Sequence, residues 1–495
     1  MRRRRTAALG VTLAIGVACV VSLRSLLGDA EPTTYVPPPL AWSACYVDVQ
    51  CAELEVPLDH DDPASSTATL SVVRQPVLDQ SKRLGVLLVV PGGPGGQGVP
   101  YIRDGSIFSV ALRERFDVVS WNPRGVSEGT QVDCGESLES LTSGLDPTPE
   151  TESEVSAWRE RSQTFADGCR KRSGDLLPHL STVSSARDID ALRVALGEEQ
   201  LSLLGISYGT AVTSVYATLF PDRVRAAVLD GAYDIGAPLG GSNVQWATAN
   251  ERALTTMLRR CSRDTLCPFH SEGDPFGAFD RLMEQLERAP LGTGADRLDL
   301  QRAWTAIRFS LYNEFGWDAL LSALESARRG DGAELRHLAT SFGTSFDAAI
   351  SISCLDRRRD EFTMDDDTAA AVLAAAPRFG RWVAGWRDSV CSFWPVEPDP
   401  PPAVTAKGAG LVLVVGSTGD VATPLAASRD LATRLDRAAL LTVEGNHHTS
   451  YWGDATDREC VRVVVDGYFI DLDVPGESLL CREDLLVPEV QASSD

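Results

Sequence analysis

The chain has 495 residues, 43% of them hydrophobic, and its formal net charge is −23. This length exceeds that of a typical single domain, so the composition predicts a folded core carrying an inserted segment. The strong negative charge argues against nucleic acid as a partner. It is compatible with an extracellular protein and with cationic substrates.

The N-terminus has the pattern of an export signal. Four arginines, Arg2–Arg5, precede an apolar run at 7–23, and a candidate cleavage site lies near residues 28–30. Residues 1–30 are therefore interpreted as a signal peptide. The alternative is an uncleaved membrane anchor, since the run approaches the length of a span. Either way, the sequence predicts a protein that is secreted or held at the cell envelope, with no other membrane contact.

A proline-rich linker at 31–40 leads into the first predicted strands, at 67–74, 84–90 and 116–121. A helix is expected at 184–196, followed by strands at 201–204 and 225–230. This alternation of strands and helices is typical of an α/β fold with a mostly parallel sheet and helices on both faces.

A glycine-rich loop, 91–98, follows the apolar strand at 84–90. Its glycines allow backbone N–H groups, with Gly93 as the candidate, to approach a substrate oxygen closely. A phosphate site is a poorer interpretation. The loop lacks the Lys-Ser/Thr ending of a P-loop and the G-x-G-x-x-G spacing into a helix.

The pentapeptide at 205–209 places Ser207 between two glycines, after the strand at 201–204 and before a helical stretch at 210–219. A serine at such a strand-to-helix turn is the nucleophile elbow of α/β-hydrolases. The N–H of Tyr208 would then face a developing oxyanion. The pattern G-x-S-x-G also arises by chance, so its position between a strand and a helix carries the interpretation.

From about residue 235 the pattern becomes helical, and Pro395–Pro402 marks its end before the sheet resumes near 411. We therefore predict a hydrolase core at 31–235, a helical cap at 236–404 between the serine strand and the acid strand, and the rest of the core at 405–495. The predicted cap helices are 250–260, 276–288, 299–312, 317–329 and 368–375.

The last part of the chain supplies the partners of Ser207. Asp420 follows an expected strand at 410–415, and two adjacent histidines, His447 and His448, follow another at 439–443. The order Ser, Asp, His is that of an α/β-hydrolase triad. Asp420 could instead be an ordinary turn residue. The spacing does not decide which histidine is the base.

These motifs together resemble the secreted tripeptidyl aminopeptidases of actinobacteria, in the proline-iminopeptidase branch of the α/β-hydrolases. The resemblance spans nearly the whole mature chain. It implies Ser207 as nucleophile and Asp420 as acid. It also implies His448 as base, because the family's histidine loop resembles G-x-G-H-T. Departures at Gln97, Asn122 and Ser127 put the substrate preference in doubt, without touching the triad. The matching segments are 51–59, 91–98, 115–119, 122–125, 205–210, 220–224, 228–231 and 420–424.

Without Cys19, which lies in the apolar leader, ten cysteines remain. An even number in an exported chain indicates disulfides. Proximity along the chain and the family resemblance imply the pairs 45–51, 134–169, 261–267, 354–391 and 460–481. A zinc site is a poor alternative, because the sequence has no C-x2-C pair and its histidines do not cluster with cysteines.

The sequence therefore predicts a secreted serine hydrolase without cofactor or metal, acting on a peptide or a small ester. An aminopeptidase that releases short peptides is the first hypothesis, and the resemblance implies tripeptides. Such an enzyme needs a carboxylate for the substrate's ammonium group, with Glu314 and Asp356 as cap candidates. A carboxylesterase or lipase is the alternative, and a non-catalytic binding protein the third hypothesis. No oligomeric state is indicated.

Overall fold

The computed structural model describes residues 35–103, 108–135, 141–142, 144–340, 345–385, 390–451, 459–482 and 485–488. The predicted leader, 1–30, lies outside these residues. None of the helices in the described ranges combines the length and the apolar character that a membrane span needs.

A single eleven-stranded sheet forms the centre of the described chain. The seven strands β4 to β10 run parallel, while β1, β2 and β3 at one edge and β11 at the other pair antiparallel. The order across the sheet is β1 (Ser43–Tyr46), β2 (Val49–Pro57), β3 (Thr67–Gln75), β5 (Phe116–Trp121), β4 (Gly85–Val90), β6 (Leu201–Ile206), β7 (Val224–Asp230), β8 (Val412–Ser417), β9 (Ala438–Val443), β10 (Ser478–Arg482) and β11 (Leu485–Pro488).

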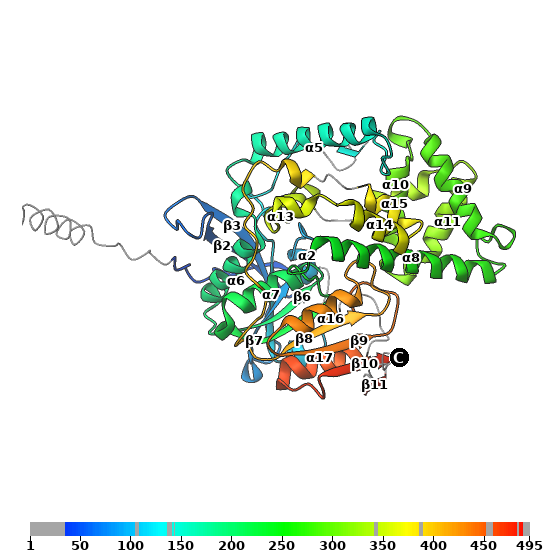
Figure 1. Cartoon of the computed structure of the whole chain (residues 1–495). Helices are drawn as coiled ribbons and strands as arrows, with labels where there is room; N and C mark the ends of the chain where they lie inside the picture. The colour runs from blue at the N-terminus through cyan, green and yellow to red at the C-terminus, as the bar shows by residue number, and fades with distance from the viewer. Residues whose placement is uncertain are drawn as a thin grey trace, which may run out of the picture.

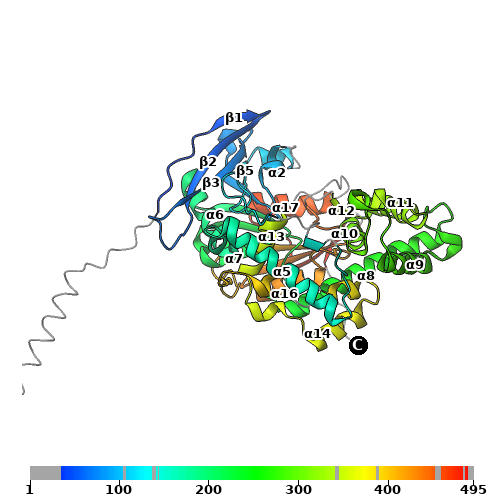
Figure 2. The ribbon, with the colours of Figure 1, turned by 90° about the horizontal axis from the view of Figure 1, so that it is seen from above.

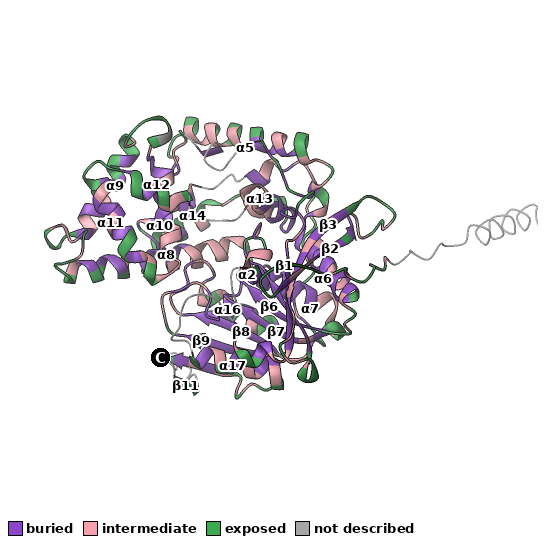
Figure 3. Ribbon diagram, turned by 180° about the vertical axis from the view of Figure 1, so that it is seen from behind, coloured by how far each residue is buried: buried purple, intermediate pink, exposed green. Residues whose placement is uncertain are grey.

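The central strands are buried on both faces (Figure 3). Strand β4, with the sequence GVLLVV, contributes Leu88 to the apolar layer on one face of the sheet and Leu87 to the layer on the other. Such continuous apolar runs are typical of parallel strands covered by helices on both sides. The core helices are α2 (Val99–Arg103), α3 (Val110–Arg113), α6 (Thr182–Leu196), α7 (Gly209–Leu219), α16 (Leu425–Arg434) and α17 (Glu459–Asp471).

A helical insertion connects β7 to β8 and lies over one end of the sheet (Figures 1 and 2). It has an apolar core of its own, which includes Met257, Phe279, Trp304 and Phe379. The fold is therefore the α/β-hydrolase fold that the sequence predicts, with a mostly parallel sheet and a helical insertion. The helices of the insertion are α8 (Leu239–Arg263), α9 (Pro275–Arg288), α10 (Leu300–Ser310), α11 (Trp317–Arg328), α12 (Ala333–Thr340), α13 (Phe346–Leu355), α14 (Asp366–Ala375) and α15 (Phe379–Ala384).

One long helix that the sequence analysis did not identify, α5 (Glu152–Ser173), precedes the elbow in the chain but lies across the insertion, far from the sheet (Figure 1). Thr151 and Glu154 form a capping box at its start. The ring of Phe165 packs against Phe346 of α13, with 5.7 Å between centroids. The helical layer above the sheet is thus built from two separate parts of the chain.

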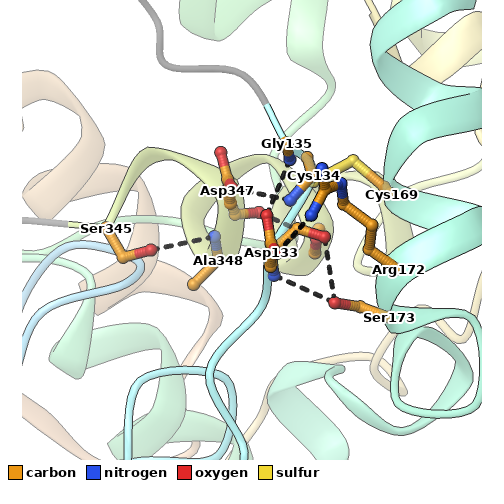
Figure 4. The surroundings of a disulfide bond; sticks show 10 residues. Asp133, Cys134, Gly135, Cys169, Arg172, Ser173, Ser345, Asp347 and Ala348 are labelled. Atoms are coloured by element: carbon orange, nitrogen blue, oxygen red, sulfur yellow. Dashed lines mark hydrogen bonds and ion pairs between the residues drawn. A yellow bond between two sulfur atoms is a disulfide. The ribbon is translucent and has the colours of Figure 1, made fainter.

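The structure contains five disulfides, with the pairing that the sequence analysis expected. The Cys134–Cys169 bridge joins α5 to the loop after β5 (Figure 4). Beside it, the carboxylate of Asp347 on α13 accepts the backbone N–H of Cys134 at 2.8 Å. Since stable disulfides belong to oxidising compartments, these bridges indicate an extracytoplasmic location.

Candidate active site

Ser207 stands at the sharp turn between β6 and α7, with a left-handed φ of 54°. Neighbouring segments pass so close that the flanking glycines have no room for a side chain. A Cβ on Gly205 would lie 2.6 Å from the Thr213 hydroxyl, and one on Gly209 would meet the carbonyl oxygen of Val90. This crowding requires glycine at both positions and fixes the serine at the carboxyl end of the sheet.

His448 joins Ser207 to Asp420 in one chain of hydrogen bonds. The imidazole Nε2 lies 2.8 Å from the Ser207 hydroxyl oxygen, and Nδ1 lies 2.9 and 3.0 Å from the two carboxylate oxygens of Asp420. A carboxylate in this position holds the Nδ1–H tautomer, which leaves Nε2 free to accept the serine proton.

The electrostatics of the pair favour an ionised Asp420 and a basic His448. Burial alone would raise the pKa of Asp420, but His448 and the backbone N–H of Thr423 outweigh it and lower that pKa. Burial would likewise lower the pKa of His448, but the Asp420 carboxylate outweighs it and raises the pKa of the imidazole. Each group thus stabilises the charge on the other.

Of the two adjacent histidines, only His448 reaches Ser207 in the described structure. The ring of His447 is buried, and its Nε2 lies 3.2 Å from the Ser450 hydroxyl. The geometry therefore separates two residues between which spacing could not choose.

Two backbone N–H groups are available near the serine. Tyr208 is the N-cap of α7, and Gly93 lies in the loop after β4; both line the same cavity as Ser207. Within the described ranges, neither N–H donates to a protein acceptor. Unsatisfied N–H groups beside a nucleophile are suited to hold an oxyanion.

The cavity at Ser207 has a volume of about 320 Å³ and is roofed by the insertion, through Trp246, Arg308 and Phe362. A second cavity of about 440 Å³ shares these residues, so the two adjoin. Gln97, Asn122 and Ser127, where the sequence departs from the resembled family, line neither cavity.

Comparison with known proteins identifies the family to which the chain belongs. A family model described as TAP-like protein matches residues 376–481, and one described as alpha/beta hydrolase fold matches residues 85–272. The chain is 30% identical to serine protease Hip1 of Mycobacterium tuberculosis, with 96% of each chain covered. The chain belongs to the TAP-like family of α/β-hydrolases. It is a serine hydrolase.

Two further relatives of this chain carry different names. The tripeptidyl aminopeptidase of Streptomyces lividans is 28% identical, over 89% of this chain and 86% of the relative. Carboxylesterase B of Mycobacterium tuberculosis is 31% identical, over 92% of each chain. Relatives of this chain are therefore named both as peptidases and as esterases.

The two acids that the sequence analysis offered for the substrate amine lie in different places in this TAP-like hydrolase. Glu314 does not line the cavity. It is half-exposed, pairs with Arg260 at 3.1 Å and accepts a hydrogen bond from the Asn446 side chain at 3.0 Å. Glu314 thus lies outside the cavity of Ser207, beside the histidine loop, and each of its carboxylate oxygens has a protein partner.

Asp356 does line the cavity, as Ser207 and Tyr208 do. Its side chain is buried, and its two oxygens accept hydrogen bonds from the backbone N–H and the hydroxyl of Thr182, both at 2.7 Å. Burial raises the pKa of Asp356 to about 7, because a charged carboxylate is poorly solvated there.

Asp230, at the end of β7, is a functional residue to which the sequence analysis gave no role. It is fully buried, and its carboxylate accepts the backbone N–H groups of Ser450 at 2.7 Å and Tyr451 at 2.9 Å. These bonds hold the loop that carries His448, and the nearby charge helps to raise the pKa of the imidazole. Two signals were available in the sequence: Asp230 ends an apolar strand, which is also common in ordinary turns, and it lies in the family-like segment 228–231.

Proposed function

We propose that this TAP-like hydrolase is a secreted aminopeptidase that releases short peptides, in particular tripeptides, from free N-termini. The observation that supports this best is the buried carboxylate of Asp356 in the cavity of Ser207. Each of its oxygens keeps a lone pair beyond the bond to Thr182. In a partly dry cavity, a charge-assisted bond from a substrate ammonium group to such an oxygen is stronger than in water.

In the proposed reaction, the Ser207 oxygen attacks the scissile carbonyl carbon while His448 Nε2 takes the serine proton. The N–H groups of Tyr208 and Gly93 hold the oxyanion of the tetrahedral intermediate. His448 then gives the proton to the leaving nitrogen, and the C–N bond breaks to leave an acyl-enzyme. In the second half-reaction, water attacks the acyl carbon while His448 takes its proton. His448 then returns the proton to the serine oxygen, which releases the peptide acid and free Ser207.

The roles of Asp420 and Asp356 differ in this scheme. Asp420 stabilises the imidazolium formed in each half-reaction and fixes its tautomer. Asp356 sets the distance between the substrate N-terminus and the bond that is cut. The adjoining cavity of about 440 Å³ gives the released peptide room for more than one side chain.

A carboxylesterase is the second candidate, because a relative of similar identity is named as one. The two functions are separated by a tripeptide anilide assayed with a free and with an acetylated N-terminus. We expect acetylation to lower kcat/KM by roughly a hundredfold or more, because the acid is then left buried without its cation. Equal cleavage of both peptides would exclude an aminopeptidase and leave an esterase or endopeptidase.

Two variants test the part assigned to Asp356. Asp356→Asn should lower cleavage of the free peptide, so that the ratio of kcat/KM for the free peptide to kcat/KM for the acetylated peptide falls close to one. Glu314→Gln removes the other candidate carboxylate, which lies outside the cavity, and should leave that ratio unchanged. If instead Glu314→Gln abolished the ratio, the amine would bind beside the histidine loop.

We also propose export through residues 1–30. The mature enzyme should be found in the culture medium, with an N-terminus at or near the candidate cleavage site at 28–30. Recovery of the full-length chain in the membrane fraction would favour an uncleaved anchor.

A further inference from the structure

Arg308 on α10 lies in the wall that the two cavities share. Its guanidinium carbon is 5.1 Å from the ring centre of Trp246 and 4.9 Å from that of Phe309. Stacking on aromatic rings holds the flat guanidinium group in place without using its hydrogen-bonding edge. The cation is thus fixed where a substrate would lie.

Among the described residues, Arg308 forms no ion pair. Its guanidinium donates one long bond, from Nη2 to the Tyr312 hydroxyl at 3.3 Å, and its buried Nε–H has no acceptor. The half-buried Arg378 differs, because two of its nitrogens bind Asp280 at 2.7 and 3.0 Å. A sheltered cation without an anion is costly, and this chain of net charge −23 has no shortage of carboxylates.

The acids that line the larger cavity are engaged elsewhere. Asp360 pairs with Arg358 at 2.6 Å, and Glu361 accepts the backbone N–H of Arg358 at 3.1 Å. Asp365 caps the start of α14. The donors of Arg308 therefore remain available to a molecule in the cavity.

We propose that Arg308 is an anion subsite that binds a carboxylate of the substrate. The planar donor edge of arginine matches a carboxylate in two parallel hydrogen bonds, and the sheltered cavity strengthens them. The inference rests on the proposed hydrolysis at Ser207. It adds a second charge requirement, opposite in sign to that of Asp356. The carboxylate can come from an acidic side chain of the released peptide, or from the C-terminus of a short substrate.

The test compares matched acid and amide substrates. One series is tripeptide anilides with Glu or Gln at each of the three positions, and the other is tetrapeptides with a free or an amidated C-terminus. The wild-type enzyme should prefer the acid in one series by about ten- to a hundredfold in kcat/KM. If Arg308 binds an acidic side chain, the preference for the acid appears in the first series. If it binds the C-terminal carboxylate, the preference appears in the second.

Variants of Arg308 decide whether it carries this preference. Arg308→Gln should bring the acid-to-amide ratio close to one, and Arg308→Lys should keep part of it. Arg308→Glu should reverse it in favour of a lysine-bearing substrate. Arg328→Gln is the matched control on α11, because Glu325 keeps its second partner Arg329. Thermal melting and the rate of fluorophosphonate labelling report whether each variant is folded.

The proposal is overturned if the acid-to-amide ratio of kcat/KM is one in both series for the wild-type enzyme. It is also overturned if Arg308→Gln retains the wild-type preference for the acid. Failure of the proposed aminopeptidase function looks different, because N-acetylation would then have no effect. In that case the p-nitrophenyl monoester of adipic acid and its terminal amide measure the same preference on an esterase. Equal rates for that pair would also overturn the anion subsite.

Discussion

The backbone N–H of His448 donates to the carbonyl oxygen of Tyr312 at 2.6 Å, and the two rings pack edge to face, with 5.2 Å between centroids. Tyr312 belongs to the insertion, directly after α10, whereas His448 belongs to the core. The helical insertion is thus attached to the loop that carries the proposed base. Its packing can affect the alignment of the imidazole as well as substrate entry.

This contact predicts different effects for two substitutions of Tyr312. Tyr312→Phe keeps the ring and removes only the hydroxyl that Arg308 contacts, so turnover of a neutral substrate should change little. Tyr312→Ala removes the ring packing, worth about 0.5–1.5 kcal/mol for an aromatic pair, and should lower kcat several-fold for peptides and esters alike. Steady-state kinetics of both variants check this. Equal effects would mean that the ring does not position His448.

The raised pKa of His448 predicts the acid limb of the pH profile. The base must be neutral to accept the serine proton, so kcat/KM should rise with pH through a value above the ordinary 6.5 or so of histidine. Asp420→Asn removes the charge that stabilises the imidazolium, so this limb should move to lower pH while kcat falls. The corresponding change in a Ser-His-Asp protease costs about 10⁴ in kcat. An acid limb that stays in place in Asp420→Asn would contradict this account.

The two histidines offer an internal comparison. His448→Ala should remove nearly all turnover, while His447→Ala should reduce it far less, since its ring contacts the Ser450 hydroxyl and not Ser207. Burst and steady-state rates on the same anilide measure both. If His447→Ala proved the more damaging, the hydrogen bonds seen here would not be those of the reacting enzyme.

The sequence predicted the central strands of the sheet, because they are continuous apolar runs that end in glycine-rich turns, but it did not predict the edge strands β1, β2, β10 and β11. β4 and the glycine loop after it are one case, and β6 with the elbow is another. The contribution of α5 could not be predicted. Its capping box and helical composition favour a helix, but nothing local indicates that it crosses the insertion rather than the sheet.

The surroundings of Ser207 were predictable where motifs carry chemistry, and not where tertiary packing decides. Glu314 and Asp356 are similar in sequence, each near an apolar residue at the end of a cap helix. Only the folded chain puts Asp356 beside Thr182 in the cavity and Glu314 against Arg260 outside it. Arg308 gave no signal either, because its distinguishing feature is the lack of an anionic partner among the described residues.

The Cys134–Cys169 bridge predicts a measurable contribution to stability. Replacing both cysteines with serine should lower the free energy of unfolding by about 2–5 kcal/mol. The Cys45–Cys51 bridge closes a loop of sequence separation 6 rather than 35, so its removal should cost less. Denaturant unfolding of the two double variants measures the difference. An equal or reversed order would contradict the chain-entropy explanation.

The most direct test of the proposed mechanism is labelling with a fluorophosphonate followed by mass spectrometry of the digested enzyme. The proposed mechanism predicts one adduct, on the serine of the elbow, and its loss in a folded Ser207→Ala variant that also loses nearly all turnover. In a comparable serine protease, loss of the nucleophile costs about a millionfold in kcat. Labelling at another residue, or a Ser207→Ala enzyme that keeps a substantial part of its activity, would contradict the assignment of Ser207 as the nucleophile.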